Sequence, residues 1–288
     1  MLTSDLPNIT RRQQDILRLL YSYRFLNRIQ IQTLLEHKDY KTINMWLKDL
    51  TAKGYTVRIY NPNHFAEKTK PAIYYLALNG IRYLKSRNYD DEYEQYATTE
   101  LRKRYRESSR SQSYIDRCLL LADCTISLDQ ARDETSYPNT YYFYETEADY
   151  VGGSYYHFMS EAEYIHPQLC FSKEQYDGWG EPYSAEHYLL EVFDTNLPRY
   201  RLKKRLTNYV QYLDEESDEW KRGAEHDKLP IVLLICQRTS DLIYAKRRTR
   251  GLLAELWEYD DTDKPHIRFA TVKDIQAQGV LGDVWEEA

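Results

Sequence analysis

The sequence has no apolar run long enough to cross a membrane, which takes about 20 consecutive residues. Its first residues, MLTSDLPNITRRQQ, also lack the continuous apolar core of a secretory signal. We therefore expect a soluble, cytoplasmic protein with no membrane partner.

The sequence is also poor in cysteine, with four residues at positions 118, 124, 170 and 236. Their spacing fits neither a zinc ligand set nor a compact disulfide framework. We interpret them as reduced thiols in the core. The pattern therefore predicts no structural metal and no resident cofactor.

The net charge of −6 hides an asymmetry between the two ends of the chain. Residues 1–89 carry 15 Lys and Arg against 6 Asp and Glu, whereas the rest carries 24 against 39. A basic first third followed by an acidic remainder indicates a nucleic-acid-binding face at one end. A basic surface that is merely solvated is the alternative.

The first third contains three segments with helical spacing of apolar residues. Thr10 precedes RRQQDILRLLYSY as an N-cap, and Asn27 precedes a second, shorter helix. The third helix is YKTINMWLKDLTAKG, for which Gly54 is placed as the C′ residue. Two short helices joined by a tight turn are typical of a helix-turn-helix unit.

In a helix-turn-helix unit, the later helix enters the major groove with its N-terminal end first. Lys and Asn side chains can read purine edges or hold phosphates, and Thr and Tyr suit phosphate oxygens. The candidate DNA-contacting residues on this helix are Tyr40, Lys41, Thr42, Asn44 and Lys48.

The segments TVRIY and AIYYLAL are strands by composition and flank the polar loop NPNHFAEKTKP. This loop is longer than a hairpin needs, and it is basic. We interpret the hairpin as a wing that reaches the DNA backbone or the minor groove through His64, Lys68 and Lys70. A winged helix that docks a protein and never touches DNA remains the alternative.

The remainder of the chain has a different pattern. Residues 90–113 form a charged linker, partly helical, and an apolar helix follows from Tyr114. Five strand-like segments then alternate with two helical segments: the strands at 140–150, 163–171, 187–195, 229–237 and 266–272, and the helices at 197–216 and 247–259. This alternation predicts a mixed α/β domain over residues 114–288, in which 188–193 and 231–236 are central, parallel strands.

One set of polar residues in this domain resembles the PD-(D/E)xK restriction-endonuclease layout. In that layout two acids hold a divalent ion such as Mg²⁺, and a Lys activates the attacking water. Glu191 ends one strand, and Lys203 and Lys204 open the next helix. Gln168, however, stands where the first acid is expected, and a neutral amide is a poor ligand for a hard cation.

The expected strand Lys is also replaced, by Phe193. Lys203 or Lys204 could substitute for it, and Glu147, Asp149 or Glu163 could replace the lost acid. The acidity of this domain argues against a second DNA-binding face, because phosphates would be repelled. We therefore favour a nuclease-like domain without catalysis and keep a metal-dependent nuclease as the alternative.

Taken in order, several segments over residues 10–245 resemble the replication-relaxation proteins of plasmids, integrative elements and phages. They include RRQQDILRLLYSYRFLNRIQIQTLL, YYLALNG, HPQLCF, YLLEVFDT, KKRLTNYVQYL and PIVLLIC. Glu191, Lys203 or Lys204, and Tyr209 match that pattern, whereas Gln168 replaces its Asp and Asp194 is shifted by one place. The resemblance implies a DNA-binding role in replication, mobilisation or control of a mobile element.

The sequence thus predicts an α+β protein with three parts: a winged helix-turn-helix domain at 1–89, the linker at 90–113 and a restriction-endonuclease-like domain at 114–288. We expect the first domain to bind double-stranded DNA, as part of a homodimer on a two-fold site. The second domain would mediate dimerisation or docking of a replication or mobilisation protein. An adaptor that binds only proteins is the remaining hypothesis.

Overall fold

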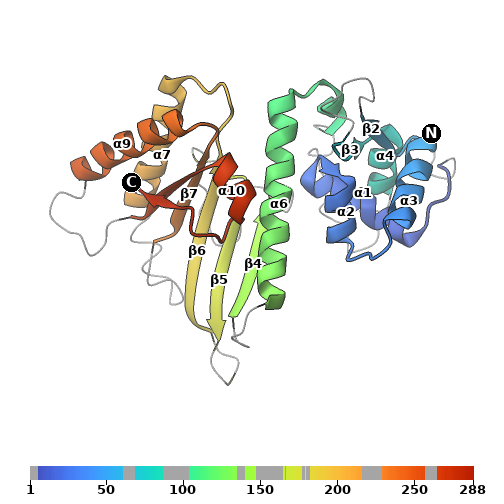
Figure 1. Cartoon of the computed structure of the whole chain (residues 1–288), viewed down its shortest axis with the longest axis horizontal. Helices are drawn as coiled ribbons and strands as arrows, with labels where there is room; N and C mark the ends of the chain where they lie inside the picture. Colours follow the sequence, from blue (N-terminus) through green and yellow to red (C-terminus); the bar gives the residue numbers. More distant parts are fainter. Residues whose placement is uncertain are drawn as a thin grey trace. The chain divides into compact units, whose positions relative to one another are not determined.

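The computed structural model describes residues 6–60, 69–86, 104–134, 140–146, 165, 167–176, 179, 182–215, 229–256 and 265–288 (Figure 1). The chain forms two compact units, and the boundary between them follows Ala122. Each unit is described separately below. No helix within the described ranges combines the length and the apolar character needed to span a bilayer.

The first unit begins with three helices: α1 (Arg11–Tyr23), α2 (Arg28–Leu34) and α3 (Tyr40–Ala52). Thr10 and Asn27 are the N-caps of α1 and α2, as predicted. In the structure both form full capping boxes. Asp39 caps α3, and Gly54 follows that helix with a φ of 73°, which glycine adopts without steric cost.

A small antiparallel sheet completes the winged helix. Its strands are β1 (Leu26–Asn27), β2 (Thr56–Ile59) and β3 (Ile73–Leu76), in the order β1-β3-β2. The predicted hairpin is confirmed, with Thr56 opposite Leu76 and Ile59 opposite Ile73. Helix α4 (Leu78–Ser86) follows β3.

The first unit extends beyond the expected limit at residue 89. After the short 3₁₀ helix η4 (Arg104–Ser109), helix α6 (Gln112–Glu134) begins in this unit. Ile115 and Cys118 of α6 pack against Phe25 and Tyr75 on one face of the small sheet. The domain boundary therefore lies within α6, because half of this helix covers apolar surface of the winged helix.

The second unit is built on a six-stranded mixed sheet of order β4-β5-β6-β7-β8-β9. Its strands are β4 (Thr140–Thr146), β5 (Leu169–Tyr176), β6 (Pro182–Val192), β7 (Ile231–Cys236), β8 (Ile267–Thr271) and β9 (Glu286–Glu287). The strands β4, β5 and β6 pair antiparallel, whereas β6, β7 and β8 are parallel. The predicted parallel central pair and the mixed α+β architecture are confirmed.

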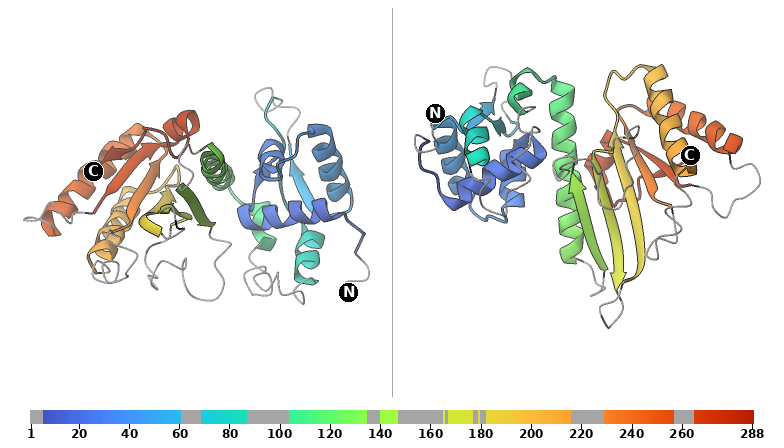
Figure 2. Two further views of the ribbon diagram at one scale, coloured as in Figure 1. Left: turned by 90° about the horizontal axis from the view of Figure 1, so that it is seen from below. Right: turned by 180° about the vertical axis from the view of Figure 1, so that it is seen from behind.

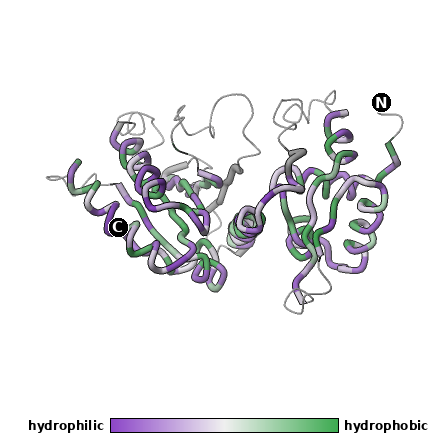
Figure 3. Tube along the Cα trace, turned by 90° about the horizontal axis from the view of Figure 1, so that it is seen from above, coloured by the Kyte–Doolittle hydropathy of each residue, from purple (hydrophilic) through white to green (hydrophobic). Residues whose placement is uncertain are grey.

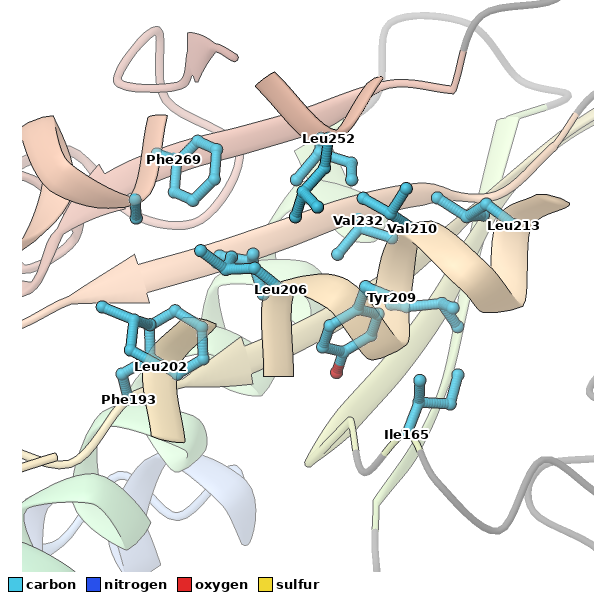
Figure 4. Packing of buried hydrophobic residues seen from close by; sticks show 14 of the residues in the cluster. Ile165, Phe193, Leu202, Leu206, Tyr209, Val210, Leu213, Val232, Leu252 and Phe269 are labelled. Carbon is cyan, nitrogen blue, oxygen red and sulfur yellow. The ribbon is translucent and has the colours of Figure 1, made fainter. Parts of the chain in front are cut away.

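Helix α7 (Arg199–Glu215) connects β6 to β7, and α9 (Thr239–Leu256) connects β7 to β8. Both helices lie along one face of the sheet (Figure 2). They bury Leu206, Tyr209 and Leu252 against Val232 and Phe269 (Figure 4). Hydrophobic residues accordingly gather in the strands, and hydrophilic stretches lie on the helices (Figure 3).

Some element limits differ from the sequence prediction. Strand β5 continues through the polar stretch SKEQY to Tyr176, because it pairs with β4 on one side and β6 on the other. Helix α9 starts at Thr239 instead of residue 247, and α10 (Val272–Gln278) and β9 have no counterpart in the prediction. Cross-strand pairing outweighs local propensity in such polar stretches.

The four cysteines are free and buried, which confirms their interpretation as core thiols. Burial raises the pKa of Cys118 to about 11 and the pKa values of Cys124 and Cys236 to about 12. These thiols therefore stay protonated and unreactive at neutral pH.

We predict that Gly80→Ala destabilises the first unit by about 1–3 kcal/mol, because a Cβ there would overlap the Tyr55 carbonyl oxygen and lie 2.9 Å from Leu76 Cδ2. The matched control is Gly251→Ala in α9, where an added Cβ meets nothing within 4 Å. We expect that control to stabilise the second unit by about 0.5–1 kcal/mol. Urea denaturation of the two variants measures both effects, and equal stabilities would contradict the packing at Gly80.

Candidate nucleic-acid interface

Helix α3 has one buried and one exposed side. Ile43, Leu47 and Leu50 are fully buried in the core of the first unit. Because the helical repeat places the intervening residues on the other side, that side is open to solvent. It presents Lys41, Asn44 and Lys48 together with Tyr40 and Met45, which are 52% and 60% exposed.

Thr42, the fifth predicted residue of this helix, has a structural contact. Its hydroxyl donates a hydrogen bond of 2.6 Å to Asp39 Oδ2, and its backbone N–H donates to the same oxygen. The bond from the Thr42 hydroxyl and the bond from the Lys41 N–H lower the pKa of Asp39. The hydroxyl of Thr42 thus helps to fix the first turn of α3.

The predicted wing residues are described only in part. Lys70 is exposed just before β3. His64 and Lys68 lie outside the described residues.

Two arginines that the sequence analysis did not select belong to the same unit, one at the start of α2 and one on β2. Arg28, the first residue of α2, has its Cζ 5.8 Å from the centre of the Tyr40 ring. Arg58 of β2 has its Cζ 4.6 Å from the centre of the Tyr60 ring. Arg58 could have been found from the strand alternation of TVRIY, because it stands between two less exposed residues.

Tyr74 connects the two arginines. Burial raises the pKa of its hydroxyl, and Arg58, which hydrogen-bonds to it, and Arg28 both oppose that rise through their positive charges. Arg58 also stands opposite Tyr74 in the pairing of β2 with β3, and Tyr74 itself is buried. The series from Tyr40 through Arg28, Tyr74 and Arg58 to Tyr60 joins the start of α3 to the wing, and we call it the Arg–Tyr row.

The orientation of α3 is fixed from its other end. Gln13 of α1 donates from Nε2 to Asp49 Oδ2 at 2.7 Å, and Lys53 Nζ contacts the same oxygen at 2.7 Å. These bonds lower the pKa of Asp49, with the bond from Lys53 as the largest cause. Lys53 is thus an anchor of the helix, whereas Lys41 and Lys48 face solvent.

In the second unit, Gln168 takes part in strand pairing. Its backbone N–H donates to the Leu190 carbonyl at 2.8 Å, and its side-chain Oε1 accepts from the Val192 N–H at 2.7 Å. Its side chain therefore extends the contact between β5 and β6 beyond the end of the backbone ladder. The Gln168 side-chain oxygen, which could have faced a metal, instead accepts the hydrogen bond from Val192 at the end of β6.

Glu191 is 1% exposed and forms an ion pair with Arg205 of α7. The side chains of Lys203 and Lys204 are exposed, so the expectation that one of them would stand at Glu191 is corrected to Arg205. The helical repeat turns position 205 toward the sheet and positions 203 and 204 away from it.

These residues do not fit a Mg²⁺ site of the restriction-endonuclease type. Gln168 is neutral and bonded to a strand N–H, and the Glu191 carboxylate is neutralised by a guanidinium. Within the described ranges, no group of three or more His, Cys, Asp or Glu side chains is arranged to hold a metal ion. Glu147, Asp149 and Glu163, the suggested substitutes, lie outside those ranges.

We predict that Arg205→Ala destabilises the protein by about 3 kcal/mol, because it leaves the buried Glu191 carboxylate without its charge partner. Glu191→Gln removes the buried charge instead and leaves the partly exposed arginine in contact with water, so we expect a loss of about 1 kcal/mol. Chemical denaturation compares the two variants. A larger loss for Glu191→Gln than for Arg205→Ala would contradict this ion-pair model.

Comparison with known proteins gives a family for this chain. Residues 17–226 match the replication-relaxation family model. No curated protein matches the chain.

Two solved structures show partial similarity. A Cys-to-Ser mutant of MarR from E. coli, complexed with operator DNA, is 17% identical, covers 40% of this chain and 73% of its own, and gives a TM-score of 0.24. Restriction endonuclease FokI is 14% identical over 95% of this chain, with a TM-score of 0.29, and this chain spans only 45% of FokI. The family match covers most of the sequence, and the chain belongs to the replication-relaxation family.

Proposed function

We propose that this protein binds double-stranded DNA through its winged helix. The observation that carries the proposal is the continuity of the exposed side of α3 with the Arg–Tyr row. Lys41, Asn44 and Lys48 face solvent, and Arg28 links Tyr40 at the start of α3 to Arg58 through Tyr74. An exposed helix that carries ammonium groups, with guanidinium groups on the neighbouring α2 and β2, suits a duplex backbone and groove.

Each residue has a role that follows from its chemistry. Lys41 and Lys48 hold phosphates, and Asn44, which has both a donor and an acceptor, reads a base edge in the major groove. Tyr40 contacts a phosphate oxygen near the start of α3, and Thr42, whose hydroxyl proton goes to Asp39, keeps that first turn in place beside it. Arg58, Lys70 and the wing residues His64 and Lys68 contact the neighbouring backbone or minor groove.

The biological role we propose is replication, mobilisation or transcriptional control of a mobile genetic element. Membership of the replication-relaxation family supports a DNA-binding role in such elements. One winged helix buries little area on DNA, so tight binding calls for a homodimer on a two-fold site. The second unit would serve this dimerisation or dock a replication or mobilisation protein in the cytoplasm.

We predict that Lys41→Ala lowers the slope of log affinity against log salt by about one unit, since one phosphate contact is lost. Asn44→Ala should instead cost about 1–3 kcal/mol and relax the preference at one base pair. Fluorescence anisotropy with a duplex from upstream of the gene measures the first effect, and selection from a randomised duplex pool measures the second.

Lys85→Ala in α4 is the matched control, because α4 contributes nothing to the Arg–Tyr row. It should leave both the affinity and the salt slope unchanged. If the unaltered protein shows no salt-dependent affinity for any duplex, the adaptor hypothesis replaces this proposal.

We propose further that the second unit does not cleave DNA. Plasmid incubated with the protein and Mg²⁺ or Mn²⁺ should remain supercoiled, because the Gln168 oxygen and the Glu191 carboxylate are both engaged within the protein. Gel electrophoresis reads the outcome. Nicking that is lost in Glu191→Ala but kept in Lys273→Ala would show that the domain is an active nuclease.

A further inference from the structure

The second unit carries a basic surface that its acidic composition conceals. The sequence has no Asp or Glu from position 195 to 213 or from 242 to 254. These stretches contain most of α7 and α9, with five Lys or Arg at positions 199–205 and four at positions 246–250. Arg205 is paired with Glu191 and Lys246 with Glu286, so seven of these nine cations leave a net positive charge on one helical layer.

The two helices begin at the same edge of the sheet. Because β6 and β7 are parallel, α7 and α9 both start beyond the carboxyl ends of their preceding strands. The contact between Arg199 and Tyr244 confirms this placement, with the Arg199 Cζ 5.0 Å from the centre of the ring. The start of α7 therefore adjoins the first turns of α9, where Asp241 is paired with Arg238.

The charges at the start of α7 are in an unfavourable place for helix stability. The N-terminal end of a helix carries partial positive charge, so acidic residues stabilise it and basic residues do not. The first turn of α7 has no acidic residue and begins with Arg199 and Arg201. Lys203 and Lys204 are exposed and form no salt bridge within the described residues. Residues that oppose local stability in this way commonly serve a site.

An aromatic side chain stands among these charges. Tyr200 is 68% exposed, and its hydroxyl accepts a hydrogen bond of 3.2 Å from Arg201 Nε. The guanidinium carbon of Arg201 lies 5.9 Å from the ring centre. Proteins that bind single strands combine a positively charged track for the backbone with exposed aromatic rings on which unpaired bases stack. Bases within a duplex are already stacked and cannot use such a ring.

We propose that the start of α7, together with the adjoining part of α9, is a second nucleic-acid site that binds single-stranded DNA. Lys203, Lys204 and Arg201 hold successive phosphates, and a base stacks on Tyr200. The proposal goes beyond the duplex-binding function of the winged helix and stands on different residues. It gives the nuclease-like unit a binding role that needs no metal.

The test is fluorescence anisotropy of the full-length protein with a labelled oligodeoxythymidine, which forms no duplex. Lys203→Glu with Lys204→Glu should weaken binding at least about tenfold and lower the salt slope by about 1.4, since a single strand loses about 0.7 per phosphate contact. Tyr200→Ala should weaken binding about five- to a hundredfold, whereas Tyr200→Phe should keep it. Lys273→Glu, an exposed lysine of α10, is the matched charge control and should change nothing.

Duplex binding by the winged helix and single-strand binding at the start of α7 can be refuted independently. Loss of duplex binding in Lys41→Ala with Lys48→Ala, without loss of oligodeoxythymidine binding, supports independent sites. The single-strand site is refuted if the unaltered protein does not bind oligodeoxythymidine at low salt, or if the substitutions at 200, 203 and 204 leave that binding unchanged. It is also refuted if the substitutions at 41 and 48 abolish both kinds of binding. Thermal unfolding by circular dichroism confirms that each variant is folded.

Discussion

Burial of one side of α3 is the constraint on which the proposed interface depends. Ile43, Leu47 and Leu50 are fully removed from water, and burying each contributes about 1.5–3 kcal/mol. Rotating the helix to hide Lys41 and Asn44 would expose these three side chains and bury charge. The hydrophobic effect therefore sets which residues of α3 face solvent, and the hydrogen bond from Gln13 to Asp49 ties this helix to α1.

In the second unit, the polar residues expected at a metal site serve structure instead. Gln168 satisfies a strand N–H with its side chain, and Arg205 neutralises a carboxylate that would otherwise be a buried, unpaired charge. Both side chains thus make their polar contacts within the protein, Gln168 from just before β5 and Glu191 near the end of β6. The positive charges that remain outside, at Lys203 and Lys204, are then available for a ligand with phosphate groups.

Net charge was a poor guide to this unit. The excess of Asp and Glu beyond residue 89 argued against a second DNA-binding face, yet two stretches without acidic residues come together on α7 and α9. Salt screens charges beyond about 8 Å at physiological ionic strength, so a local cluster matters more than the sum over a domain. Which charges become neighbours depends on the parallel pairing of β6 with β7, a long-range contact.

The sequence by itself determined the first three helices and the hairpin of the winged helix, together with the exposed side of α3. Capping residues such as Thr10 and Asn27 and the spacing of Ile43, Leu47 and Leu50 act within a few residues of each other. Only the tertiary structure decided that α6 belongs partly to the first unit, that Arg28 and Arg58 flank Tyr74 and that Arg205 meets Glu191. Most of these contacts join segments that are far apart in the chain, and local patterns carry no information about such partners. The pairing of Glu191 also depends on which of three nearby cations, Lys203, Lys204 or Arg205, the helix turns toward the sheet.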